Sequence, residues 1–165
     1  MLFLRMPRYI SNKTLRLRPL RMSDSPFILS GLNGVDIVKA KSLSIPIALS
    51  WLSMWWQMKK TFCPAYCIEH DSKQIGFIGL YNLISGQSAE VSLIIFDISN
   101  RRRGYGTMAF RLLTQALMRA CLIKNLSVTV KEDNHASTSL WKKLGFKTMR
   151  SHNGLTEMIF PLERF

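Results

Sequence analysis

Between an apolar segment and a long amphipathic one, the chain reads Phe96-Asp97-Ile98-Ser99-Asn100-Arg101-Arg102-Arg103-Gly104-Tyr105-Gly106-Thr107. The two glycines let consecutive backbone N–H groups point into one concavity, and a helix that begins here adds the positive end of its dipole. Three consecutive arginines add positive charge and forked donors, although some of them must face solvent. The stretch therefore predicts a strand, then a turn that can bind a pyrophosphate, then a helix.

The segments beside this turn have the periodicities of a helix and of strands. The apolar positions downstream recur at helical spacing and form one buried face: Ala109, Leu112, Leu113, Ala116, Leu117 and Ala120. Upstream, residues 65–69 and 75–83 are apolar runs separated by His70-Asp71-Ser72-Lys73, which is typical of a hairpin. Glu90 to Phe96 supplies a third strand, so these segments together predict a meander that leads into the turn.

The N-terminal part predicts one more strand and two helices. Thr14 to Arg18 alternates apolar and charged residues as a half-buried strand does. Ser23-Asp24 can cap a short helix that runs to about Leu32 and ends in the region from Gly31 to Gly34. A further helix, rich in tryptophan, is expected to begin near Pro46.

The C-terminal part predicts a strand, a helix and a final strand pair. Residues 126–130 alternate as a strand, and Asp133-Asn134 can cap a helix that Gly145 ends. Two last strands are expected near residues 146–150 and 155–162. The whole pattern predicts an α+β domain, a three-layer α/β sandwich whose mixed, mostly antiparallel sheet carries helices on both faces.

Length and composition fit one globular domain over residues 1–165. With 47% hydrophobic and 20% charged residues, the chain resembles ordinary globular proteins, which excludes a collagen-like repeat or a disordered tail. Cys63, Cys67 and Cys121 match neither a disulfide framework nor a zinc or redox spacing, so we expect a reducing cytoplasm. The three histidines form no helical ligand pair, and we expect no metal.

The charge of +13 favours polyanionic partners such as phosphate cofactors, nucleic acid or an acidic membrane surface. The basic first 23 residues superficially resemble a mitochondrial transit peptide, but their strand pattern favours a place in the fold. Residues 42–58 carry no charge, yet they are shorter and more polar than the roughly 20 apolar residues of a spanning helix. We therefore expect no membrane association through this segment.

Two motifs in this order resemble the GNAT N-acetyltransferase superfamily. Arg101, Gly104 and Gly106 form its R-x-x-G-x-G pattern between a strand and an amphipathic helix. Asn134-His135-Ala136-Ser137-Thr138-Ser139-Leu140-Trp141-Lys142-Lys143-Leu144-Gly145-Phe146 is similar to the family's N-x-x-A/S-x-x-L-Y-x-K-x-G-F segment. The opening Leu15-Arg16-Leu17-Arg18-Pro19-Leu20 and Asp24 resemble the branch that includes ribosomal-protein N-terminal acetyltransferases.

The resemblance implies an acetyl-CoA site. The sheet would be splayed at the strand Glu90 to Phe96, and the main chain of Ile94, Ile95 and Phe96 would bind the pantetheine arm. The pyrophosphate would rest on the N–H groups of the turn, which are those of Arg101, Arg102, Arg103, Gly104, Tyr105, Gly106 and Thr107. Asn134 would contact pantetheine or serve as a helix cap, Lys143 would reach the adenosine phosphate end, and Trp141 would pack in the core beside the cofactor.

The implied reaction is direct attack of a primary amine on the thioester. An attacking amine must be neutral, so a carboxylate base is expected, and Glu90 is the candidate; the alternative is a solvent-facing glutamate at a strand end. Trp141 stands where many family members carry a tyrosine that protonates the thiolate, and an indole is no acid near neutral pH. The identity of the group that protonates the thiolate is therefore left open by the sequence.

Other function classes remain beside this one. Gly104, Gly106 and Ala109 also satisfy the dinucleotide fingerprint G-x-G-x-x-A, but the glycines do not follow the strand directly and the remaining chain is too short for a doubly wound fold. The charge alternatively suggests a nucleic-acid- or ribosome-binding module on a catalytically weak GNAT scaffold.

The acceptor amine is left open by the sequence. A protein N-terminus or a small-molecule amine such as an aminosugar would fit, with Trp51, Trp55 and Trp56 as a wall of its site or as core residues. The oligomeric state is open as well.

Overall fold

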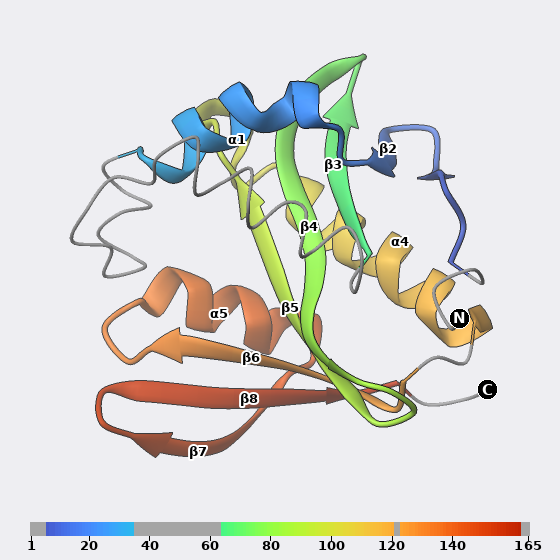
Figure 1. The fold of residues 1–165 in the computed structure, drawn as a ribbon. Coiled ribbons are helices and arrows are strands. Elements are labelled where there is room, and N and C mark those ends of the chain that lie inside the picture. Colours follow the sequence, from blue (N-terminus) through green and yellow to red (C-terminus); the bar gives the residue numbers. More distant parts are fainter. Residues whose placement is uncertain (1–5, 35–63, 121–122, 163–165) are drawn as a thin grey trace.

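The computed structural model describes residues 6–34, 64–120 and 123–162, and a single eight-stranded sheet runs through them (Figure 1). Its strand order is β1-β2-β3-β4-β5-β6-β8-β7, and β5 and β6 are parallel whereas the other neighbours are antiparallel. The strands are β1 (Ile10–Ser11), β2 (Leu15–Pro19), β3 (Ala65–His70), β4 (Lys73–Ile84), β5 (Ser88–Ile95), β6 (Asn125–Lys131), β7 (Lys147–His152) and β8 (Leu155–Pro161). The described α-helices are α1 (Ser25–Leu32), α4 (Tyr105–Ala120) and α5 (His135–Leu144), and two short 3-10 helices, η2 (Met22–Asp24) and η3 (Ile98–Asn100), precede α1 and α4.

The helices lie on both faces of this sheet. Side chains of a strand alternate between its faces, and along β5 Val91 joins the cluster that contains α4, whereas Ile94 joins the cluster beneath α1. Trp141 of α5 packs against Phe110 of α4, so both helices share one face. The predicted three-layer, mostly antiparallel architecture is confirmed.

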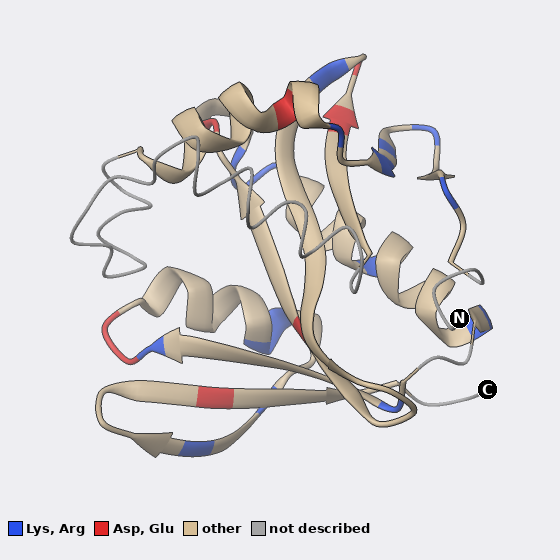
Figure 2. Ribbon diagram, in the orientation of Figure 1, with Lys and Arg blue, Asp and Glu red and all other residues tan. Residues whose placement is uncertain are grey.

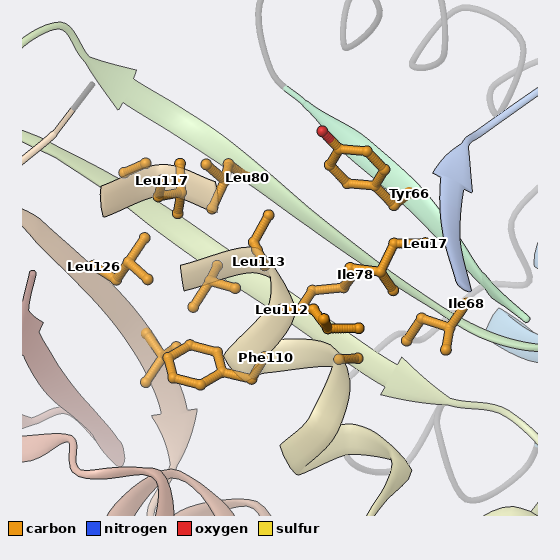
Figure 3. Close-up of a cluster of buried hydrophobic side chains, with 14 of the residues drawn as sticks. Leu17, Tyr66, Ile68, Ile78, Leu80, Phe110, Leu112, Leu113, Leu117 and Leu126 are labelled. Carbon is orange, nitrogen blue, oxygen red and sulfur yellow. The ribbon is translucent and has the colours of Figure 1, made fainter. Parts of the chain in front are cut away.

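Helix α4 contributes more buried residues to the larger core than any other described element (Figure 3). Leu113 and Leu117 are fully buried, and Phe110 is 2% exposed, as the helical spacing of the apolar residues predicts. Each fully buried side chain of this size contributes about 1.5–3 kcal/mol to folding. Because α4 packs against β4 and β5, its N-terminal end is held in place at the glycine-containing turn.

The charged residue Arg18 of β2 is buried, which the alternating pattern of that strand did not predict. Its guanidinium donates two hydrogen bonds of 2.8 Å to the carboxylate of Asp24 and one to Glu69. Burial tends to raise the pKa of Asp24, but the hydrogen bonds from Arg18 and from the Arg21 N–H lower it overall. This ion pair ties β2 and β3 to the start of α1.

The first helix forms within the predicted bounds. Asp24 is the N-cap residue of α1, although its side chain makes no capping hydrogen bond there, and η2 (Met22–Asp24) precedes the helix. Gly31 lies within α1, where an added Cβ would come within 2.3 Å of the Phe96 ring. This glycine therefore allows close approach of α1 to the end of β5, and Asn33 ends the helix.

Other expectations are confirmed or lie outside the described residues. The hairpin β3–β4, strand β6, helix α5 and the final pair β7–β8 form close to the predicted bounds, and β1 and β2 place residues 10–19 in the sheet. The tryptophan-rich helix expected near Pro46, together with Cys63 and Cys121, lies outside the described ranges. None of the described helices is long and apolar enough to cross a membrane.

Candidate active site

The parallel strands β5 and β6 separate part-way along their length (Figure 1). They pair over three positions, the last of which is Glu90 with Ser127, while β5 continues to Ile95 and β6 to Lys131. On its other side β5 stays paired with β4 as far as Ile95. In the described residues, one edge of β5 beyond Glu90 is therefore left without a strand partner, as the expected splay requires.

The turn after β5 presents backbone donors next to this open edge. Asp97 accepts a hydrogen bond of 2.8 Å from the Ser99 N–H and so caps η3, which begins the turn. Gly104 has a φ of 83°, a conformation that costs other residues energy, and α4 begins immediately after it. The first N–H groups of a helix have no partner within the helix, so those of Tyr105, Gly106 and Thr107 are suited to an anion.

The three arginines of the turn lie in different environments. Arg101 is half-buried, and its guanidinium donates to the main-chain oxygens of Ile95 (2.8 Å) and Phe96 (2.9 Å). Its own N–H donates to Ile98 O. Arg102 and Arg103 are exposed. Arg101 thus closes the turn onto the end of β5, and phosphate contact by these arginines stays a prediction.

Main-chain hydrogen bonds also restrict which groups of β5 are open. The Phe96 N–H donates to Ile75 O of β4, so it points away from β6. The Ile95 carbonyl accepts from Arg101, as described above. The pantetheine contact of Ile94, Ile95 and Phe96 remains a prediction. Because the N–H groups of successive strand residues point to opposite sides, the Ile95 N–H points toward the open edge and is the best candidate for this contact.

Helix α5 begins with the predicted cap. The Asn134 side chain accepts a hydrogen bond of 3.1 Å from the Ser137 N–H, which confirms its role as a cap and leaves its pantetheine contact a prediction. Trp141 is 5% exposed and packs edge-on against Phe146, and its indole N–H donates to Ser137 Oγ at 3.1 Å. Trp141 is therefore a core residue with its single donor engaged, whereas Lys143 is exposed.

Glu90 is half-buried at the point where β5 and β6 separate. Asn82 Nδ2 donates to Glu90 Oε1 at 2.8 Å, and Tyr81 of β4 lies directly opposite Glu90 in the antiparallel register. Burial, the negative charge of Glu90 and a side-chain hydrogen bond with Glu90 raise the pKa of Tyr81. The sequence did not single out Tyr81 or Asn82, because strand register decides which side chains face Glu90.

Comparison with known proteins identifies the family. Residues 14–147 match the family described as "Acetyltransferase (GNAT) domain". The chain belongs to this family.

A curated relative, the L-2,4-diaminobutyric acid acetyltransferase of Vibrio parahaemolyticus, is 40% identical over 81 residues. The match covers 47% of this chain and 42% of that relative, so it spans less than half of the relative's length.

Solved structures of family members show the same fold. Spermidine N-acetyltransferase of Vibrio cholerae, in complex with CoA and spermine, superposes with a TM-score of 0.77 at 20% identity, over 92% of this chain and 97% of that one. The Salmonella typhimurium acetyltransferase that modifies the N-terminal serine of ribosomal protein L7/L12 superposes with a TM-score of 0.77 at 16% identity, over 94% of this chain and 99% of that one.

Among the described residues, no group of three His, Cys, Asp or Glu side chains could hold a metal ion.

Proposed function

We propose that this protein transfers an acetyl group from acetyl-CoA to a primary amine by direct attack. The observation that carries the proposal is that β5 and β6 stop pairing at Glu90, which leaves the edge of β5 open beside the N-terminus of α4. An extended chain of amides can add to such an edge, and the helix N-terminus suits a pyrophosphate. The residues present therefore fit acetyl-CoA.

The proposed mechanism requires little side-chain chemistry. Acetyl-CoA supplies an activated acyl group with a thiolate leaving group, whose thiol has a pKa of about 8.5. The amine nitrogen forms the new bond to the carbonyl carbon, the C–S bond breaks, and Glu90 receives the proton from nitrogen. A main-chain N–H on the open edge of β5 stabilises the oxyanion.

The proton that the thiolate finally takes up comes from water in this scheme. Trp141 stands at the position of the family's tyrosine, is buried, and donates its N–H within α5, so it does not take over the role of an acid. Because a thiolate leaves without full protonation, the reaction does not require a side-chain acid.

The acceptor is proposed only as a class: a protein N-terminus or a small-molecule amine such as an aminosugar. Family members named above act on diaminobutyrate, spermidine and an N-terminal serine, all of which present a primary amine. The half-buried carboxylate of Glu90 suits such an amine in each case. We propose the cytoplasm as its location, since Cys67 is a buried free thiol.

Thermal unfolding against increasing acetyl-CoA, with NADH as the control ligand, tests the cofactor. A ligand of the native state raises the unfolding midpoint by mass action, so we expect a dose-dependent rise with acetyl-CoA alone. No shift at about 1 mM would contradict the proposal. Thiol release with L-2,4-diaminobutyrate, spermidine, glucosamine and a peptide with N-terminal serine then identifies the acceptor class.

A second candidate function is contact with nucleic acid or the ribosome through basic surface. The exposed ring of Tyr9 lies near two guanidiniums, those of Arg8 (6.0 Å) and Arg16 (4.8 Å), and Lys13 is exposed between β1 and β2. Several Lys and Arg positions lie along this edge of the ribbon (Figure 2). If this surface binds RNA, retention on an RNA column falls steeply between low and physiological salt. Retention that is independent of salt, or unchanged in an Arg8→Gln, Arg16→Gln variant, would contradict this role.

A further inference from the structure

Glu90 is held by residues of the neighbouring strand β4, and the catalytic meaning of these contacts rests on the proposed role of Glu90 as the base. Glu90 of β5 and Tyr81 of β4 are cross-strand partners, as are Ile94 and Phe77 four residues away. Since strand residues four apart share a face, Glu90 and Tyr81 lie on the face that Ile94 and Phe77 share with α1. The carboxylate therefore lies on the face opposite α4.

The pairing of β4 with β5 becomes irregular immediately after Tyr81. The register shifts between Tyr81 and Ile84, and Asn82 within this bulge has a φ of 47°. Left-handed backbone is unusual for any residue except glycine, and asparagine is among those that tolerate it best. Bulges of this kind re-aim a side chain. Here the bulge turns the Asn82 amide back along the sheet onto the Glu90 carboxylate.

The partners of Glu90 differ from those of three ion-paired carboxylates in the described chain. Asp24 and Glu69 lie against Arg18, and Glu157 accepts two hydrogen bonds from Arg150. Glu90 instead accepts from the neutral amide of Asn82 and interacts with the phenol of Tyr81, whose raised pKa keeps it protonated. Its neighbour on β6 is Ser127, also neutral. Neutral donors hold the carboxylate in place without cancelling its charge.

We propose that Asn82 is a positioning residue for Glu90. Its hydrogen bond to Oε1 fixes the carboxylate at the point where β5 and β6 separate, so that the charge remains available to the incoming amine. A general base must be held within hydrogen-bonding reach of the proton that it accepts, and a misplaced group costs rate even when it is present. The left-handed bulge is the backbone device that brings the amide to this position.

The test compares Asn82→Gly with Asn153→Gly. Glycine accepts the left-handed backbone, so Asn82→Gly removes the amide without adding strain. Asn153 also has a positive φ, of 51°, but it lies exposed in the β7–β8 turn, far along the chain from Glu90, and it serves as the matched control. We expect Asn82→Gly to lower kcat about tenfold with the KM for acetyl-CoA unchanged, and Asn153→Gly to change neither.

Repeating Asn82→Gly in a Glu90→Gln background shows whether the two residues act together. If Asn82 acts by positioning Glu90, the second substitution has no further effect on kcat in that background. Equal losses in both backgrounds, or an Asn82→Gly enzyme as active as Asn153→Gly, would overturn the proposal while leaving Glu90 as the base. Full turnover by Glu90→Gln at every pH would overturn the base and the proposal with it.

A readout that needs no acceptor is the side-chain NH₂ resonance pair of Asn82, assigned by its loss in Asn82→Gly. In the wild type we expect these signals to differ from those of a free side-chain amide, and in Glu90→Ala, which removes the hydrogen-bond acceptor, we expect that difference to disappear. Signals at the same positions in both proteins would show that the hydrogen bond does not form.

Discussion

Replacing Asp24 by asparagine should strongly destabilise the fold, because it leaves the buried Arg18 guanidinium without its main counter-charge. The side chains of Arg18 and Asp24 are 8% and 3% exposed, and the Asp24 carboxylate also accepts from the Arg21 N–H and from Gln74. Removing one partner of a buried ion pair typically costs about 3–5 kcal/mol. Glu69 remains as a second partner of Arg18 and moderates the loss, so we expect about 3 kcal/mol.

Urea unfolding at pH 7 measures this loss of stability. The matched control is Glu157→Gln, which breaks an exposed pair with Arg150 and should change the free energy of unfolding little. The triple replacement Arg18→Met, Asp24→Leu, Glu69→Met removes all three charges of the cluster and should be more stable than Asp24→Asn alone. An Asp24→Asn protein within about 1 kcal/mol of the wild type at an unchanged m-value would show that Asp24 does not stabilise the buried Arg18 guanidinium in this way.

The same pair predicts how stability depends on pH. The pKa of Asp24 is lowered in the folded chain, so the carboxylate contributes stability that is fully present above its unfolded-state pKa of about 4. That contribution is lost as the pH falls through the lower, folded-state pKa. The wild type should therefore lose more stability than Asp24→Asn between pH 5 and pH 2, about the range of the titration. Parallel losses in both proteins would contradict this assignment.

Three further substitutions test the elements around the site. Gly31→Ala places a methyl group against the Phe96 ring and should cost about 1–3 kcal/mol in urea unfolding, with partial recovery when Phe96 is made leucine. Gly104→Ala forces a side chain into a left-handed turn, so calorimetry should show weaker acetyl-CoA binding and about 1–2 kcal/mol lower stability. Arg101→Lys keeps the charge but cannot bridge two carbonyls; we expect weaker acetyl-CoA binding, whereas Arg103→Lys at an exposed position should bind normally. Equal binding by the two lysine variants would contradict the bridging role of Arg101.

Local signals predicted much of the fold correctly. The spacing of Leu113 and Leu117 predicts the buried face of α4, because a helical period is a property of nearby residues. Asn134 was expected to cap α5 and does so, since a cap bonds to a backbone group three residues away. The two glycines predicted a turn between the strand and the helix, and Gly104 does lie in a turn directly before α4.

The errors and omissions have one physical origin, which is contact between segments distant in the sequence. Gly31 lies near the end of the helix as predicted, but its contact with Phe96, 65 positions later in the chain, was not predicted. Arg18 looked like a solvent-facing residue of an amphipathic strand, yet it is covered by α1 and bonded to Glu69. Neither contact can be predicted from the residues that adjoin it in the sequence.

Short-range spacing and motifs within one segment were enough to predict the order and type of the described elements, the glycine-containing turn and the family. Long-range contacts set the exact point at which β5 and β6 part, the bonds of Arg101 to the end of β5, and the contact of Asn82 with Glu90. Strand register selects which residues of distant segments become neighbours. A half-buried carboxylate acquires its partners in that step, and with them the environment in which it can act.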